Sequence, residues 1–166
     1  MDKLIVPDLA LMRLWLEQSG VSFFECDSCQ ALHLPHLQSI DGIFDAKVDL
    51  LENVILFSAV AEIRPIALIP LVADLSQINA SSLTTKVFVD IQDDNLPKLV
   101  ICQSLSVGAG IAIEQFQLLL QEAEEQTTQI IMEARANELL MISDNDGDRE
   151  AEEDIQIARP VTHTIH

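Results

Sequence analysis

The side chains with the most reactive chemistry in this sequence lie in one short stretch, residues 22–37. Cys26 and Cys29 are spaced as Cys-x-x-Cys, and His33 and His36 follow within seven residues of the second cysteine. Two thiolates and two imidazoles are a ligand set suited to zinc, which prefers four sulfur or nitrogen ligands. These four residues are therefore candidate metal ligands, and the cysteine pair alone is a candidate for thiol–disulfide chemistry.

The spacing also argues against both kinds of chemistry. The interval between Cys29 and His33 is shorter than zinc fingers commonly use, and His33 and His36 would point to opposite faces of an extended strand. A redox Cys-x-x-Cys normally begins a helix, whose N-terminus lowers the thiol pKa, whereas this pair lies between two strand-like segments. We therefore expect a hairpin turn with reduced thiols and no bound metal or cofactor. Zinc binding and thiol redox sensing remain as alternatives.

A second metal-like pattern lies near the end of the chain. Residues 144–153 match an EF-hand calcium loop from its third position onward. The first position would be Ile142, which has no ligand atom, and Arg149 occupies a position that is normally apolar. We expect an acidic tail here and no calcium site.

Periodicity predicts the elements that hold the cysteine stretch. Asp8 can cap a helix that runs to about Ser19, with Gly20 just beyond its end. Residues 21–25 and 30–34 read as two strands with the cysteines at the turn between them. Further strands are expected at residues 43–51, 53–61, 84–92 and 98–105. Because the strand at 53–61 is apolar on both faces, we expect it to be central in the sheet.

Two more helices are expected. Residues 64–80 are apolar most of the way round a helix, so this helix should be buried on several sides or form a dimer contact. Its regular part should begin near residues 67–69, because Pro70 fits a first turn. A long amphipathic helix should cover residues 113–141, with glutamates on its outer face. The residues predicted to bind a protein partner are Leu68, Leu71, Val72 and Leu75.

These elements predict an α+β fold, an antiparallel sheet with three helices, in one domain over residues 1–141. The remainder, residues 142–166, reads as an acidic, disordered tail. The net charge is −18 with only nine basic residues, which argues against direct binding to nucleic acid or to an anionic membrane. No segment reads as a signal peptide or a bilayer span, so we expect a cytoplasmic protein. No grouping of catalytic side chains stands out, so we expect no enzyme activity.

Four segments of the sequence resemble the YbjN family of enterobacterial proteins, over about residues 1–141. They are FFECDSCQALHLPH at 23–36, GIFDAK at 42–47, DLSQINASSL at 74–83 and QDDNLPKL at 92–99. The resemblance implies a sensory-transduction regulator with the α+β fold of type III secretion chaperones. It also implies negative control of exopolysaccharide production, motility and related virulence traits, and it is greatest to the plant-pathogen members. It implies no catalytic residues.

Three functional hypotheses follow. The first is a non-enzymatic regulator that acts by binding an unidentified protein. The second is a chaperone for a secreted effector, which predicts a homodimer with an exposed apolar groove. The third is a zinc or thiol redox sensor that uses Cys26 and Cys29.

Overall fold

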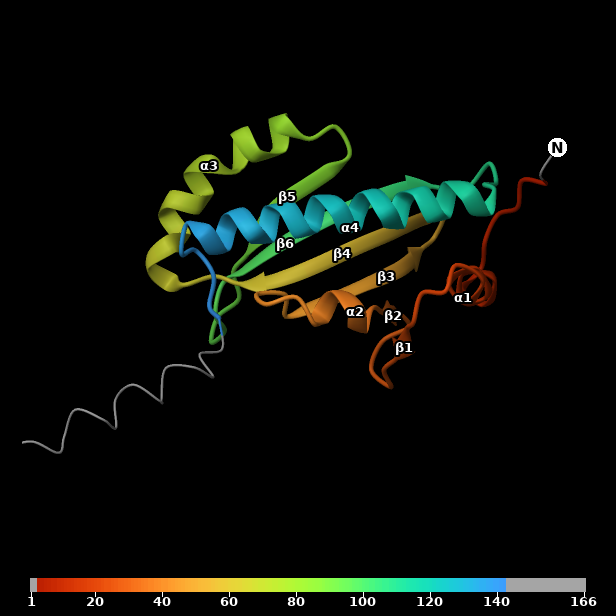
Figure 1. Cartoon of the computed structure of the whole chain (residues 1–166), viewed down its shortest axis with the longest axis horizontal. Helices are drawn as coiled ribbons and strands as arrows, with labels where there is room; N and C mark the ends of the chain where they lie inside the picture. The colour runs from red at the N-terminus through yellow and green to blue at the C-terminus, as the bar shows by residue number, and fades with distance from the viewer. Residues whose placement is uncertain (1–2, 143–166) are drawn as a thin grey trace, which may run out of the picture.

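The alternation of apolar and polar side chains along the predicted strands produces one six-stranded antiparallel sheet (Figure 1). The structure, a computed structural model, describes residues 3–142. The strands are β1 (Phe24–Glu25), β2 (Leu32–His33), β3 (Asp45–Leu51), β4 (Val54–Glu62), β5 (Thr85–Asp90) and β6 (Lys98–Ser106). They are arranged in the order β1-β2-β3-β4-β6-β5. The central place of β4, between β3 and β6, confirms the prediction made from its two apolar faces.

The helices are α1 (Leu9–Gln18), α2 (Pro35–Gln38), the short 3₁₀ helix η1 (Pro65–Ala67), α3 (Leu68–Ser81) and α4 (Ile113–Ala136). The longest of them, α4, lies across the sheet and contacts β4 and β6 (Figure 1). Alternate side chains of β4, including Ile55 and Phe57, are fully buried with Phe116 and Ile131 of α4 in one core. This order of helix, strands, helix, strands and long helix confirms the predicted α+β class.

The opposite face of the sheet is covered by no helix within residues 3–142. Its side chains come from the other alternate positions of the strands, and Leu56 of β4 and Val100 of β6 are only half-buried. His33 is paired with Lys47 of β3 in the β2–β3 register, so both lie on this uncovered face. The cysteine stretch therefore belongs to the side of the sheet that the helices leave open.

Helices α1 and α4 end in the same hydrogen-bonding pattern, although only one of the two ends is marked in the sequence. In α1 the N–H groups of Gly20 and Val21 donate to the carbonyls of Glu17 and Leu16, and Gly20 has a φ of 69°. This is a Schellman motif, in which the residue after the cap is left-handed and usually glycine. The predicted end of α1 is confirmed, as is its N-cap, since Asp8 accepts a hydrogen bond from the Leu11 N–H.

The end of α4 comes earlier than the predicted residue 141. Glu138 and Leu139 donate to the carbonyls of Arg135 and Ala134, which repeats the pattern of α1. The left-handed position is held here by Glu138, with a φ of 56°. No glycine marks this turn, so the helix end carries no stop signal in the sequence. The apolar residues after it belong to a bridge between Leu140 and Ile63.

Helix α3 is far more exposed than its composition predicts. Its regular part begins at Leu68 after the 3₁₀ turn, as expected from Pro70, but Leu71 is its only buried residue. The prediction of a helix buried on several sides is therefore wrong for the single chain. The reason is its place in the fold, because α3 packs beside β5, the last strand of the sheet, and so has core on one side only.

The side chain of Asn79 fixes α3 to β5. Its amide nitrogen donates to the Val87 carbonyl at 2.9 Å, and its amide oxygen accepts from the Val87 N–H at 2.7 Å. This pair of bonds aligns the helix with the strand.

No helix within residues 3–142 combines the length and the apolar character that crossing a bilayer requires.

Candidate functional site

The hairpin of β1 and β2 brings the two cysteines and one histidine together. Phe24 and His33 are opposite each other in its register, and the residues between the strands fold back over the imidazole. The sulfur atoms of Cys26 and Cys29 and a ring nitrogen of His33 all lie within 4.8 Å of one another. One of these contacts joins Cys29 Sγ to His33 Nε2 at 3.2 Å.

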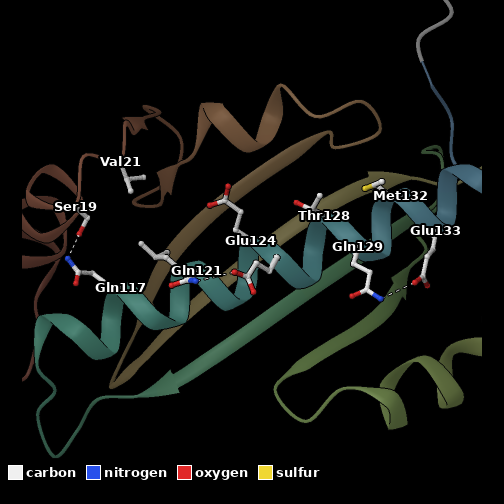
Figure 2. Close-up of a pocket in the computed structure, with 11 residues that line it drawn as sticks. Ser19, Val21, Gln117, Gln121, Glu124, Thr128, Gln129, Met132 and Glu133 are labelled. Atoms are coloured by element: carbon white, nitrogen blue, oxygen red, sulfur yellow. Dashed lines mark hydrogen bonds between the residues drawn. The ribbon is translucent and has the colours of Figure 1, made fainter.

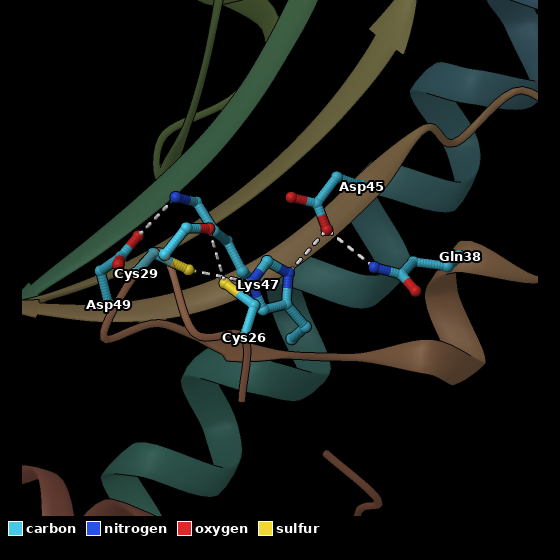
Figure 3. A network of polar contacts seen from close by, with 8 residues as sticks. Cys26, Cys29, Gln38, Asp45, Lys47 and Asp49 are labelled. Carbon is cyan, nitrogen blue, oxygen red and sulfur yellow. Dashed lines mark hydrogen bonds and ion pairs between the residues drawn. The ribbon is translucent and has the colours of Figure 1, made fainter. Parts of the chain in front are cut away.

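The imidazole of His33 is held in place from its other side. Its Nδ1 lies 2.9 Å from Asp45 Oδ1, and the same oxygen accepts a hydrogen bond from the Gln38 amide at 2.7 Å (Figure 3). The ring of Phe24 stacks on the imidazole with centroids 4.9 Å apart. Since a carboxylate only accepts hydrogen bonds, Nδ1 carries a proton. In the neutral ring, the lone pair is therefore on Nε2, the nitrogen that faces the sulfur atoms.

The pKa values of the two thiols are shifted in opposite directions. Hydrogen bonds from Cys29 first, and then from Ser28, lower the pKa of Cys26 to about 6. The same contact raises the pKa of Cys29, because its proton is shared with the Cys26 sulfur. Burial lowers the pKa of His33, but hydrogen bonds with Asp45 and Cys26 outweigh that effect, so its pKa is raised. The lowered pKa favours the thiolate form of Cys26, the form of cysteine that reacts and binds metals.

The fourth predicted ligand lies elsewhere. Pro35 begins the short helix α2, which was not predicted from the sequence. His36 on this helix faces α4, with its Nε2 3.3 Å from Glu124 Oε2. The two histidines do point apart, but because α2 turns His36 toward α4 and not because both lie on one extended strand, so the predicted set of four ligands is reduced to three. Cys102 lies half-buried on β6, and burial raises the pKa of its thiol.

Three functional contributors were missed by sequence reasoning, namely Asp45, Gln38 and Phe24. Asp45 belongs to the predicted strand at residues 43–51, but only the pairing of β2 with β3 places it beside His33. The alternation of the hairpin did contain a signal for Phe24, because residues that pair across two strands share a face. No comparable signal exists for Gln38, which reaches Asp45 from the unpredicted helix α2.

A shallow groove of about 960 Å³ runs along the exposed side of α4 (Figure 2). Its apolar lining comes from Val21, Leu120 and Met132, and its rim carries glutamates and side-chain amides. At one end Gln117 donates a hydrogen bond to the Ser19 hydroxyl at 3.0 Å, which links α4 to the end of α1. The groove is therefore lined mainly by α4, with Ser19 and Val21 contributed from elsewhere, and its rim is acidic.

The residues predicted to bind a protein partner differ in their exposure. Leu71 is buried in the core, Leu68 and Leu75 are half-buried, and Val72 is exposed. Two neighbouring isoleucines, Ile66 and Ile69, are the most exposed apolar side chains of η1 and α3, at 79% and 77%. We refer to Ile66, Ile69 and Val72 as the apolar patch. The calcium-like loop at residues 144–153 and nearly all of the predicted tail lie outside the described residues.

Comparison with known proteins places the chain in a family. Residues 8–135 match the YbjN family, described as "Putative bacterial sensory transduction regulator". The chain is 60% identical to YbjN of Escherichia coli K12 and to YbjN of Shigella flexneri over 147 residues, which is 89% of this chain and 93% of each relative. It also resembles the crystal structure of YbjN from E. coli, "a putative transcription regulator", with 61% identity and a TM-score of 0.83. That match covers 85% of this chain and all of the solved one. The resemblance seen in the sequence is thereby confirmed: the chain belongs to the YbjN family of bacterial regulators.

Proposed function

We propose that this chain is a non-enzymatic regulator that acts by binding another protein and so lowers exopolysaccharide production, motility and related virulence traits. We further infer that its nearest functional counterpart is AmyR, the family member of plant pathogens. The observation that carries the binding proposal is the apolar patch, where Ile66, Ile69 and Val72 expose their side chains on one side of η1 and α3. Exposed apolar residues that cluster on one surface are typical of protein interaction sites.

The charge of the chain favours a protein partner over DNA. Binding to a phosphate backbone requires clustered lysines and arginines, and the chain has nine of these against 27 acidic residues. Within residues 3–142, three of these basic side chains also form ion pairs with carboxylates: Arg13 with Glu25, Lys47 with Asp49 and Arg135 with Asp41. An influence on transcription would therefore pass through a second protein.

The test is complementation of a strain that lacks the gene for this chain. The double variant Ile66→Glu/Ile69→Glu places two charges in the apolar patch while leaving the buried Leu71 intact. We expect it to fold like the wild type, by circular dichroism and urea titration, and to leave exopolysaccharide output at the level of the deletion strain.

The matched control is Leu118→Glu, which replaces an exposed apolar side chain on α4, outside the patch. It should restore low exopolysaccharide output as the wild type does. Full complementation by the patch variant, or a deletion strain with wild-type output, would contradict the proposal.

The groove along α4 favours a second candidate, a chaperone that binds an extended segment of a secreted protein. Its apolar floor and polar rim suit such a segment. In the same complementation assay, Met132→Glu places a charge in this groove without touching the patch. Loss of function with Met132→Glu and not with the patch variant would favour the chaperone.

Sedimentation of the wild type and of both variants tests the homodimer. A dimer that dissociates only in the patch variant would assign the apolar patch to a second copy of the chain.

A further inference from the structure

The hairpin cluster has the donor atoms and the spacing of a zinc site. Tetrahedral zinc with Zn–S distances of about 2.3 Å and Zn–N distances of about 2.0 Å holds its ligand atoms roughly 3.5–3.8 Å apart. The two sulfurs and the His33 nitrogen already lie within 4.8 Å of one another, with one contact at 3.2 Å. Side-chain adjustments of an ångström or less would therefore place all three around a single ion.

The surroundings of His33 match those of metal-binding histidines. Such histidines usually donate their second ring N–H to a carboxylate or carbonyl, which fixes the tautomer and the direction of the ring. Asp45 does this for His33, and Gln38 in turn holds Asp45. The side chain of His33 is only 11% exposed, so the imidazole is kept in one orientation by packing as well as by hydrogen bonds.

The charges of the cluster also suit a divalent cation. Two thiolates and a neutral imidazole balance the two positive charges of the ion, and thiolate and imidazole ligands select for zinc over magnesium or calcium. The strongly acidic chain attracts cations to its surface in general. Acidity alone does not make a site, however, and here the specificity comes from the two sulfurs and the oriented nitrogen.

We propose that Cys26, Cys29 and His33 bind one zinc ion, that Asp45 is a positioning residue for His33, and that the fourth ligand comes from water or from a bound partner. Three protein ligands are the arrangement of zinc sites that keep one position for an exogenous ligand, whereas structural sites have four. The cluster lies at the edge of the uncovered sheet face, where such a ligand can reach it. This proposal stands independently of the apolar patch.

The first experiment uses the full-length chain, reduced and stripped of metal with a chelator. Zinc is titrated in competition with a chromogenic chelator, and native mass spectrometry counts the ions bound. We expect one zinc per chain in the wild type and none in Cys26→Ser/Cys29→Ser at the same free zinc. The acidic residues beyond residue 142 are identical in both proteins, so any zinc they bind is common to both.

Matched controls are available for each ligand type. Cys102→Ser removes the third thiol and His36→Gln removes the neighbouring imidazole, and both should keep wild-type affinity. His33→Gln should lose binding, and Asp45→Asn should weaken it by about 10–100-fold, the usual effect of removing the partner of a metal-bound histidine. Circular dichroism checks the fold of each variant. If His33→Gln fails to fold because His33 is buried, the half-buried ligand variant Cys26→Ser, which should also lose zinc binding, takes its place.

Cobalt gives a readout that a merely structural role would not change. Co²⁺ in the wild type should show the d–d bands of a tetrahedral ion and a sulfur-to-metal charge-transfer band, and both should be lost in Cys26→Ser. Zinc should also protect Cys26 and Cys29 from alkylation, with no change at Cys102. Equal zinc affinity in the wild type and the double serine variant, or equal losses in the control variants, would overturn the proposal. Oxidation of the pair to a disulfide, with no zinc uptake by the reduced protein, would overturn it as well.

The patch variant separates this proposal from the proposed function. Ile66→Glu/Ile69→Glu should bind zinc as the wild type does, because the patch and the hairpin lie on different elements. If zinc binds but the patch variant still complements, the partner-binding proposal fails alone. If the patch variant loses function and zinc does not bind, the metal proposal fails alone.

Discussion

Buried polar side chains in this domain are paired with few exceptions. Within residues 3–142, Thr127 on α4 has the one buried side-chain oxygen or nitrogen that lacks a hydrogen-bond partner. Thr85 on β5 is equally buried, but its hydroxyl donates to the side-chain amide oxygen Oε1 of Gln103 at 3.3 Å. The two threonines therefore differ in one respect that a single substitution can measure.

We expect Thr127→Val to raise the free energy of unfolding by about 1 kcal/mol, because it removes an unpaired buried hydroxyl while keeping the shape of the side chain. Thr85→Val should lower it by about 1 kcal/mol, because it breaks a buried hydrogen bond and leaves Gln103 with an unpaired oxygen. Urea unfolding with an unchanged slope is the measurement. A destabilised Thr127→Val would show that this hydroxyl has a partner after all.

The sequence identified part of the candidate site at this scale. The spacing of Cys26 and Cys29 marked them as ligands, whereas His36 is separated from His33 by helix α2, which strand alternation does not describe. The interval of three residues between Cys29 and His33 argued against zinc because it is shorter than the intervals found in zinc fingers. In the structure, the β1–β2 hairpin brings Cys26, Cys29 and His33 close together in space despite this interval. Asp45 is placed beside His33 only by the pairing of β2 with β3, which the local sequence does not reveal.

At the scale of elements, α1 and α4 end in the same turn with different residues at its left-handed position. Gly20 adopts this conformation without strain, and a side chain there would meet no atom within 4 Å. Glu138 adopts this left-handed conformation at a cost of about 1 kcal/mol, since the Cβ atom of an L-residue, which glycine lacks, is strained at positive φ.

We expect Glu138→Gly to stabilise the domain by about 1 kcal/mol and Gly20→Ala to destabilise it by about 1–2 kcal/mol, both through backbone strain alone. The control is Glu138→Ala, which removes the carboxylate but keeps the Cβ atom, and it should be nearly neutral. The midpoint of urea unfolding reports all three. An equal gain in the alanine and glycine variants would assign the effect to charge instead.

The strands and most helices were predictable because their signals are local. Alternation located β3 to β6, and Asp8 and Gly20 marked both ends of α1. The exposure of α3 was not predictable, because composition does not tell whether an apolar helix lies over the middle of a sheet or beside its last strand. The four-residue helix α2 was missed because Pro35, read as a strand breaker, also suits a first helical turn.

At the scale of the whole molecule, the net charge of −18 is the dominant property. Association with DNA draws its affinity from lysines and arginines that displace counterions, and this chain would have to bring 27 carboxylates toward a polyanion. The relative described as a transcription regulator shares the fold, but a shared fold does not assign a mode of action.

We expect the purified chain to bind duplex DNA more weakly than about 10⁻⁴ M at physiological salt, the weak end of ordinary non-specific binding. Fluorescence anisotropy of a labelled promoter fragment at two salt concentrations measures this, with a basic DNA-binding protein as the positive control. Saturable binding that weakens as salt is raised would show that the chain contacts DNA directly.

The side-chain amide of Asn79, which links α3 to β5, also occupies hydrogen-bonding groups on the edge of the sheet. Its nitrogen donates to the Val87 carbonyl and its oxygen accepts from the Val87 N–H, as the backbone of an added strand would. The backbone N–H and carbonyl of Val87 on the edge strand β5 therefore cannot pair with another chain. The opposite margin of the sheet is β1, only two residues long and too short to template pairing. Pairing of an added strand is therefore blocked at Val87 on one margin of the sheet and disfavoured by the shortness of β1 on the other, which limits the ability of the sheet to grow into a fibre.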